Sequence, residues 1–197
     1  MSLADPSTRR PAPTRRQQII EVAAELFAER GFGGVSINDI GAALGTSGPA
    51  LYKHFPSKDA LLAAMLIDIS ERLLGEGRRR AEACAADGAD AVLRALVAWH
   101  VEFALSHPAL ITVQFRDLES VGEEDRHTIR RLQRSYVELW VRTISAVVGA
   151  DEAHARSAAH AVFGLINSTP HSARLSRDDM AEQLQRMARA ALLACGP

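Results

Sequence analysis

The segment SINDIGAALGTSGPALYKHFP, residues 36–56, has room for only two short helices and a tight turn between them. Ser36 and Asp39 form an S-x-x-D pattern, the acidic variant of a capping box, which predicts that the first helix begins there. Gly45 ends this helix, and Ser47 is positioned to cap the second one. Because so short a second helix is unstable alone, it needs a preceding helix to pack on. Two short helices around a glycine-containing turn are typical of a helix-turn-helix.

A supporting helix is predicted directly before this segment. Thr14 is suited to cap its start, and Gly31 supplies a left-handed stop at its end. Ile19, Ala23 and Phe27 recur at the spacing of a helix with one apolar face. This apolar face would give the two short helices the surface that they pack against.

The rest of the chain carries only helical patterns. Of the 197 residues, 47% are hydrophobic and only 5% are aromatic, which favours helices over strands. Further helices are expected over residues 58–74, 89–106, 108–120, 123–148, 151–170 and 176–195. Gly75 and Gly77 would mark either a break in the fourth helix or its frayed end. We therefore predict an all-α protein with about nine helices, three of them short and crowded into residues 14–55.

Composition excludes several classes of protein. The net charge of −1 gives the chain no overall basic field, although residues 1–58 hold seven Lys and Arg against five Asp and Glu. Cys84 and Cys195 lie far apart and lack metal-site spacing, which favours a reducing compartment. No apolar run approaches the roughly 18 residues of a membrane helix, and the start lacks the apolar core of a signal peptide. The sequence therefore predicts a cytoplasmic protein without a membrane partner.

The sequence also disfavours an enzyme. It contains no H-E-x-x-H, no G-x-S-x-G and no phosphate-binding loop. His154 and His160 are six residues apart, so they fall on different faces of a helix and are poorly placed to share a metal ion. We predict no catalytic residues, no metal and no cofactor.

The second short helix, expected over residues 47–54, presents two different faces. Leu51 and Phe55 are four residues apart and point toward the core, whereas Tyr52 and His54 fall on the other side or at its edge. In a helix-turn-helix this helix lies in the major groove of DNA, and hydroxyl and imidazole groups can donate hydrogen bonds to phosphate oxygens. In the alternative interpretation, Tyr52 and His54 merely cover a small core.

The segments AAELFAERGF, SINDIGAALG and GPALYKHFPSKDALL resemble the N-terminal signature of the TetR-type transcriptional regulators, over about residues 14–66. The resemblance implies a helix-turn-helix DNA-binding domain in residues 14–56, continuing into the fourth helix, and a larger helical domain in residues 57–197. It also implies DNA contact by Ser36, Thr46, Ser47, Gly48, Pro49, Tyr52, Lys53, His54 and Lys58. Many members carry a lysine or arginine where Gly48 or Pro49 stands, so base contacts are expected from Thr46, Ser47 and backbone groups.

The first thirteen residues are expected to form a disordered arm. Residues 1–13 contain three prolines and almost nothing to bury. Arg9 and Arg10 in this arm could reach into an adjacent minor groove, as basic arms sometimes do. In the alternative interpretation, the arm is simply solvated.

The resemblance further implies that the C-terminal domain binds a small molecule and pairs two chains. Operator half-sites lie about 34 Å apart, so a dimer must hold two recognition helices at that separation. Small and apolar residues suited to such an interface lie in the last two long helices: Ala158, Val162, Phe163, Ile166, Leu184, Met187 and Ala191. A buried core stripe would show the same pattern.

A ligand pocket is expected where rings and isolated polar groups interrupt apolar helices. The residues with this character are Trp99, Phe103, Phe115, Arg116, Tyr136, Trp140, Asn167 and His171. Ordinary core packing is the competing explanation for the rings. Arg116 is the best single candidate for contact with an acidic effector, with pairing to a nearby carboxylate as the alternative.

Together these features predict a homodimeric, ligand-responsive transcriptional regulator that binds DNA. We expect a repressor that leaves a palindromic operator when a small apolar or acyl-type effector binds. The alternative is a constitutive DNA-binding protein that has no small-molecule effector.

Overall fold

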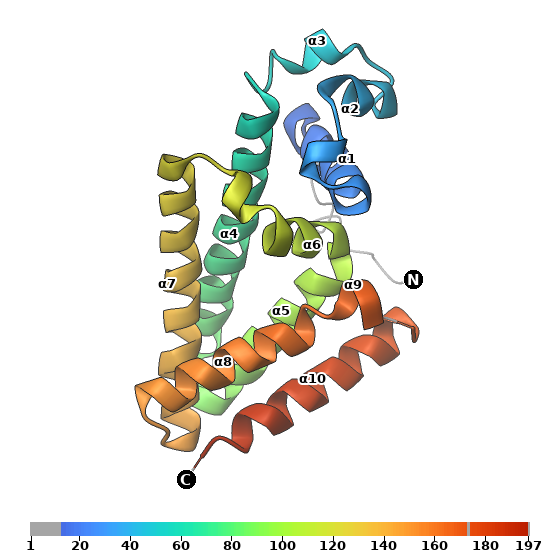
Figure 1. Cartoon of the computed structure of the whole chain (residues 1–197). Helices are drawn as coiled ribbons and strands as arrows, with labels where there is room; N and C mark the ends of the chain where they lie inside the picture. Colours follow the sequence, from blue (N-terminus) through green and yellow to red (C-terminus); the bar gives the residue numbers. More distant parts are fainter. Residues whose placement is uncertain (1–12, 173, 197) are drawn as a thin grey trace, which may run out of the picture.

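The computed structural model describes residues 13–172 and 174–196, so the expected N-terminal arm lies outside the described residues except for Pro13. The described residues form ten α-helices and no strand, which confirms the predicted all-α fold (Figure 1). The helices are α1 (Arg15–Arg30), α2 (Ile37–Ala43), α3 (Gly48–Leu51), α4 (Lys58–Ala83), α5 (Ala89–Ser106), α6 (Pro108–Arg116), α7 (Glu123–Val148), α8 (Glu152–Ile166), α9 (Thr169–Ser172) and α10 (Arg177–Leu193). Short 3₁₀ segments lie at η2 (Phe32–Gly34), η3 (Ala85–Asp87) and η4 (Leu118–Ser120). The single turn α9 stands alone where the sequence predicts one continuous helix with α8.

Side-chain caps fix the starts of the N-terminal helices. The Thr14 hydroxyl accepts a hydrogen bond from the Gln17 N–H at 3.3 Å, and the Gln17 side chain accepts one from the Thr14 N–H at 2.8 Å. Ser36 and Asp39 make the same reciprocal pair, at 3.1 and 2.7 Å. Both capping boxes satisfy N–H groups that a helix start otherwise leaves unpaired. Ser47 precedes α3 but makes no capping hydrogen bond through its side chain.

The fourth helix is continuous through both of its glycines. α4 runs unbroken past Gly75 and Gly77, so neither glycine marks a break. Gly77 is buried because the ring of Tyr136 on α7 lies against it. A Cβ atom at Gly77 would lie 2.8 Å from the Tyr136 Cε2, closer than real Cβ contacts allow. The glycine therefore permits a close crossing of α4 and α7.

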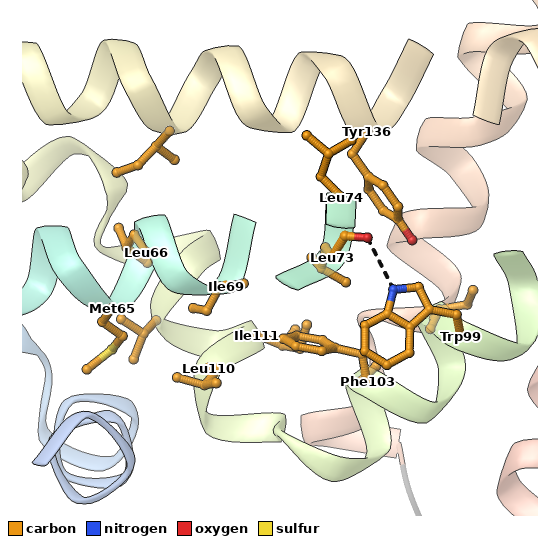
Figure 2. Packing of buried hydrophobic residues seen from close by; sticks show 14 of the residues in the cluster. Met65, Leu66, Ile69, Leu73, Leu74, Trp99, Phe103, Leu110, Ile111 and Tyr136 are labelled. Carbon is orange, nitrogen blue, oxygen red and sulfur yellow. Dashed lines mark hydrogen bonds between the residues drawn. The ribbon is translucent and has the colours of Figure 1, made fainter. Parts of the chain in front are cut away.

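One apolar core joins the N-terminal helices to the larger C-terminal part. α4 leads from the short helices into the C-terminal helices, and α6 lies between α1 and the rest of them (Figure 1). Figure 2 shows Ile69 of α4 near Ile111 of α6, within a single cluster of buried side chains that also includes Met65. Burial of each such side chain contributes about 1.5–3 kcal/mol, and the main packing partner of α6 is α1.

No single helix in the described part of the chain is both long enough and apolar enough to cross a membrane. α5 and α6 pass that test only as a pair, on length and composition, and the pair is bent by 93°.

Candidate DNA-binding face and ligand cavity

The turn between α2 and α3 is held tight by two glycines. A Cβ atom at Gly41 would lie 2.8 Å from the Gly48 nitrogen and 3.0 Å from the Thr46 carbonyl oxygen, which are backbone atoms with little freedom to move. Gly48 is itself buried, and a Cβ atom there would overlap the Asn38 side chain on α2. The expected DNA contact by Gly48 is therefore wrong, because its small size serves the packing of α3 on α2.

An exposed polar ridge follows directly after α3. Leu51 and Phe55 are only 2% and 3% exposed, as the helical spacing predicts, whereas Tyr52 is 52% exposed and Lys53 and His54 are also exposed. This exposure rules out the interpretation in which Tyr52 and His54 cover a small core. Regular helix ends at Leu51, earlier than expected, and a turn carries the chain onward, with the Phe55 N–H donating to the Leu51 carbonyl at 3.0 Å.

The remaining residues expected at DNA lie around the same face. Ser47 and Pro49 are exposed at the start of α3, and Thr46 is half-buried beside them. Ser36 and Tyr52 border one surface groove together with Lys58. The structure thus brings Ser36, Tyr52 and Lys58 together at one groove and leaves Ser47 and Pro49 exposed at the start of α3.

Lys58 has a structural role that the sequence did not reveal. Its ammonium group donates hydrogen bonds to the carbonyls of Phe32 and Val35, at 2.8 and 2.9 Å, and lies 4.3 Å from the centre of the Phe32 ring. These contacts fasten the linker around η2 to the start of α4. An ammonium group has three donors, so one remains for a phosphate oxygen.

Arg116 fastens α6 to the last turn of α1. Its guanidinium donates to the carbonyls of Phe27 and Ala28, the latter at 3.3 Å, and to both carboxylate oxygens of Asp117 at 3.1 and 3.0 Å. The Asp117 carboxylate also raises the pKa of Arg116. The expectation that Arg116 meets an acidic effector is therefore wrong, because its donors are engaged outside the cavity described next.

A cavity of about 450 Å³ lies among the C-terminal helices, within the size range of small-molecule sites. The described residues that line it are Ser70, Leu73, His100, Ile111, Gln114, Phe115, Leu118, Gln133, Tyr136, Val137, His160, Phe163, Gly164 and Asn167. The structure thus places Phe115, Tyr136 and Asn167 at a cavity, as expected for ligand-binding residues. Phe115 is 83% exposed and stands at the mouth of the cavity, whereas Tyr136 is buried.

His100 organises the buried end of this cavity. Its Nδ1 lies 3.2 Å from the Tyr136 hydroxyl and its Nε2 lies 3.1 Å from the Asn167 Oδ1. Its ring stacks on Phe163, with the ring centres 4.8 Å apart. Burial lowers the pKa of His100 to about 4 and raises that of Tyr136, so both side chains are neutral near pH 7.

Besides Arg116, four of the expected ligand-binding residues lie elsewhere. Trp99, Phe103 and Trp140 are buried in the core, and Trp99 donates from its Nε1 to the Leu73 carbonyl at 3.2 Å (Figure 2). Their burial supports the alternative explanation, in which these three rings pack in the core. His171 is exposed on α9, away from the cavity lining.

Several cavity residues escaped the sequence analysis. They are Ser70, His100, Gln114, Gln133 and His160, together with Phe163, which was expected at a dimer interface. The sequence could have indicated His100 as a cavity residue, because it is a titratable side chain between Trp99 and Val101 in an otherwise apolar stretch.

The stripe expected at the dimer interface mostly faces the chain's own core. Ala158, Val162, Ile166 and Leu184 are each at most 5% exposed, so a partner chain cannot contact them. Both faces of α8 and α10 contain small or apolar residues, and the more apolar one packs inward. Met187, at 44% exposed, and Ala191 lie on the outward side.

Acid should destabilise the protein through His100. Its pKa is about 4 in the folded chain but near 6.5 when unfolded, so the unfolded chain binds this proton first. Stability therefore falls as the pH drops from about 6.5 toward about 4, by roughly 3 kcal/mol over the whole window. The Glu76 carboxylate affects stability at lower pH. A hydrogen bond from Arg79 holds the pKa of Glu76 at about 2, so its contribution to the free energy of unfolding is lost only as the pH falls below the ordinary value of 4.5.

Chemical denaturation at about pH 7 and about pH 5 measures this effect. The wild type should lose stability between the two conditions, and His100→Gln should lose much less of it. An equal loss in both proteins would show that another group carries the acid sensitivity.

Comparison with known proteins identifies the family. Residues 19–65 match the model of the bacterial regulatory proteins of the tetR family, and residues 86–192 match that of the tetracyclin repressor-like C-terminal domain. The transcriptional repressor KstR2 of Rhodococcus jostii is 33% identical over 137 residues, covering 68% of this chain and 65% of that protein. This match thus spans slightly less than two thirds of the relative's length. The curated relatives are named as transcriptional regulators or repressors, which are not enzymes.

Solved structures share the fold over most of their length. A TetR-family regulator from Bordetella parapertussis superposes with a TM-score of 0.77 at 26% identity, covering 88% of this chain and 93% of that one. AibR, solved with isovaleryl coenzyme A and operator DNA, gives a TM-score of 0.69 at 20% identity and covers 88% and 97%. At that identity the second likeness concerns the fold alone. Since the C-terminal family model by itself matches more than half of the chain, this protein belongs to the TetR family of DNA-binding transcriptional regulators.

Proposed function

We propose that this chain is a ligand-responsive repressor that binds a palindromic operator as a homodimer and leaves it when an apolar effector fills the cavity. The observation that carries the proposal is the double role of α6. Ile111, Gln114 and Phe115 of this helix line the cavity, and the next residue, Arg116, bonds to the end of α1. A ligand that displaces α6 thereby acts on the helix that supports the DNA-binding face.

Thermodynamics fixes what such an effector must do. It has to bind more tightly to the conformation that fits the operator poorly, because equal affinity for both conformations shifts nothing. The cavity supports an effector model over the constitutive alternative, since a constitutive DNA-binding protein has no need of a hollow core. The fold neighbour AibR is described with both isovaleryl coenzyme A and operator DNA, so this fold has room for an acyl-type ligand and a DNA partner.

The DNA partner is proposed to meet the ridge formed by Tyr52, Lys53 and His54. These side chains are exposed, cationic or able to donate hydrogen bonds, and they directly follow the helix held by Gly41 and Gly48. Contacts of this kind to phosphate oxygens fix the register of a protein on DNA. The exposed Ser47 and Pro49 at the start of α3 lie nearest to where base edges would pass.

Pairing of two chains is proposed along the outward side of α8 and α10. Met187 and Ala191 on α10 are exposed there, and small residues allow two helices to approach closely. Two chains joined in this way would present two α3 helices to the two half-sites of one operator.

Tyr52→Phe should weaken operator binding without affecting folding. The hydroxyl is exposed, so its loss removes about one phosphate hydrogen bond, worth roughly a two- to tenfold decrease in affinity. Electrophoretic mobility shift measures the affinity, and thermal melting measures the stability. Tyr136→Phe is the matched control, because it removes the same atom from a buried ring and should leave operator affinity unchanged. A Tyr52→Phe variant with full operator affinity would contradict the proposed DNA face.

The effector model has its own direct test. Operator DNA is first selected from a random pool with the purified full chain, and its affinity is then titrated with ligands that stabilise the protein against heat. At least one stabilising ligand should release the DNA. If every ligand that fills the cavity leaves operator affinity unchanged, the constitutive alternative is correct.

A further inference from the structure

The buried end of the cavity contains one directional chain of hydrogen bonds. It runs through Tyr136, His100 and Asn167, which lie on α7, on α5 and just after α8. A neutral imidazole donates from one nitrogen and accepts at the other. With the Asn167 oxygen accepting from Nε2–H, the Tyr136 hydroxyl must donate to Nδ1.

In this chain of hydrogen bonds, the Asn167 side chain keeps an unused hydrogen-bonding group at the cavity. The Asn167 Nδ2 makes no hydrogen bond within the described part of the chain, and Asn167 lines the cavity. If the Asn167 amide is reversed, its Nδ2 donates to the His100 Nε2, and the His100 Nδ1–H donates to the Tyr136 oxygen. The Tyr136 O–H and the Asn167 oxygen are then the groups without a partner in this chain of hydrogen bonds. In either arrangement, a ligand oxygen at this end finds a hydrogen-bond donor, and a ligand hydroxyl also finds an acceptor.

The buried end of the cavity provides nothing to neutralise a charged ligand group. None of the described residues that line the cavity is Lys, Arg, Asp or Glu, and its second histidine, His160, is exposed to solvent on α8. The polar side chains at the buried end are an imidazole, a phenol, an amide and the hydroxyl of Ser70. Burying an ionised carboxylate among such groups without a cation is costly, whereas burying a carbonyl that receives a hydrogen bond is not. The low pKa of His100 removes the one group there that could otherwise become cationic near pH 7.

We propose that the part of the effector held in this cavity is uncharged and places a carbonyl or hydroxyl oxygen against Asn167 and Tyr136. This inference rests on the proposed function only in taking the cavity as the effector site. Two kinds of molecule share the required chemistry. One is a free ketone or alcohol with an apolar body, and the other is a thioester whose charged carrier stays outside the mouth near Phe115.

Matched ligands of equal carbon number test the charge rule. Calorimetric titration of the full chain near pH 7.5 compares methyl nonyl ketone with undecanoate. The ketone should bind at least about tenfold more tightly, and undecanoate binding as tightly as the ketone would overturn the inference. Undecanoyl coenzyme A forms the third arm. Binding of this thioester as tight as that of the ketone would identify a thioester as a source, and its weaker binding would identify the free molecule.

Paired amide substitutions test where the ligand oxygen lies. Asn167→Leu should lower the affinity for the ketone roughly tenfold and leave the affinity for undecane, which has no oxygen, nearly unchanged. Gln114→Leu removes another amide from the lining and should lower the ketone affinity less than Asn167→Leu does. If Asn167→Leu does not fold, Tyr136→Phe removes a hydroxyl from the same hydrogen-bond chain and should also weaken ketone binding. A larger loss from Gln114→Leu than from the variants at the buried end would overturn the placement.

Operator release is measured separately, so the two ideas can fail independently. A ketone that binds with the stated preference but never releases DNA would leave the inference standing and remove the effector model. A carboxylate that binds as tightly as the ketone and also releases DNA would overturn the inference and leave the effector model standing.

Discussion

Replacing Gly41 by alanine should disable the DNA-binding face. The new Cβ atom would meet the backbone of Ser47 and Gly48 at 3.0 and 2.8 Å, and a backbone cannot turn aside as a side chain can. α2 and α3 must therefore separate, at a cost of about 2 kcal/mol, typical of an overpacked core. We expect a fall in melting temperature of about 6 °C and at least a tenfold loss of operator affinity. Hydrogen exchange should become faster in α2 and α3.

Gly75→Ala is the matched control for this substitution. Gly75 is exposed on α4, and nothing lies within 4 Å of a Cβ atom placed there. Because alanine favours a helix over glycine, this variant should be more stable by up to about 1 kcal/mol and should bind the operator normally. The prediction for Gly41 is wrong if its variant melts and binds DNA like the wild type.

Arg116→Ala should uncouple the effector from DNA and destabilise the fold. The substitution removes one hydrogen bond from each of the carbonyls of Phe27 and Ala28 and leaves the Asp117 carboxylate buried without its partner. Breaking a fully buried pair costs about 3–5 kcal/mol, and because the Arg116 side chain is 42% exposed, we expect about 2 kcal/mol. The ratio of operator affinities without and with a bound effector should fall toward one. Thermal melting and mobility shift with a releasing ligand measure the two effects.

The neighbouring residue supplies the control. Phe115→Ala alters an exposed side chain at the cavity mouth and should change stability by no more than about 0.5 kcal/mol. It should weaken ligand binding while preserving release at saturating ligand. If Arg116→Ala still releases DNA as the wild type does, the link from cavity to operator runs through α4 rather than through α6.

Local features of this fold could be predicted from the sequence because their causes are local. The caps at Thr14 and Ser36 depend on residues three positions away, and the inward position of Leu51 and outward position of Tyr52 follow from helical spacing. Such features need no knowledge of what packs where. The family signature added the expectation of a DNA-binding face, which the exposure of Tyr52, Lys53 and His54 matches.

Features that depend on distant partners could not be predicted. Arg116 reaches a carbonyl 89 positions earlier in the chain, and Lys58 reaches carbonyls 23 and 26 positions earlier. A side chain that satisfies backbone groups on another helix has the same sequence signature as one that awaits a ligand. The burial of Ala158, Val162 and Ile166 could not be predicted for a related reason, since the sequence of α8 does not say which of its two faces the chain itself buries.

The uncharged character of the cavity lining sets the two proposed binding reactions apart in their response to ionic strength. Association with DNA releases condensed counterions and weakens steeply as salt rises, whereas entry of a neutral molecule into a neutral cavity hardly responds. A rise in salt concentration would therefore weaken the proposed operator complex with no effector present. The same rise would leave the affinity for an uncharged effector nearly unchanged, so salt and effector would act on the proposed complex through separate interactions.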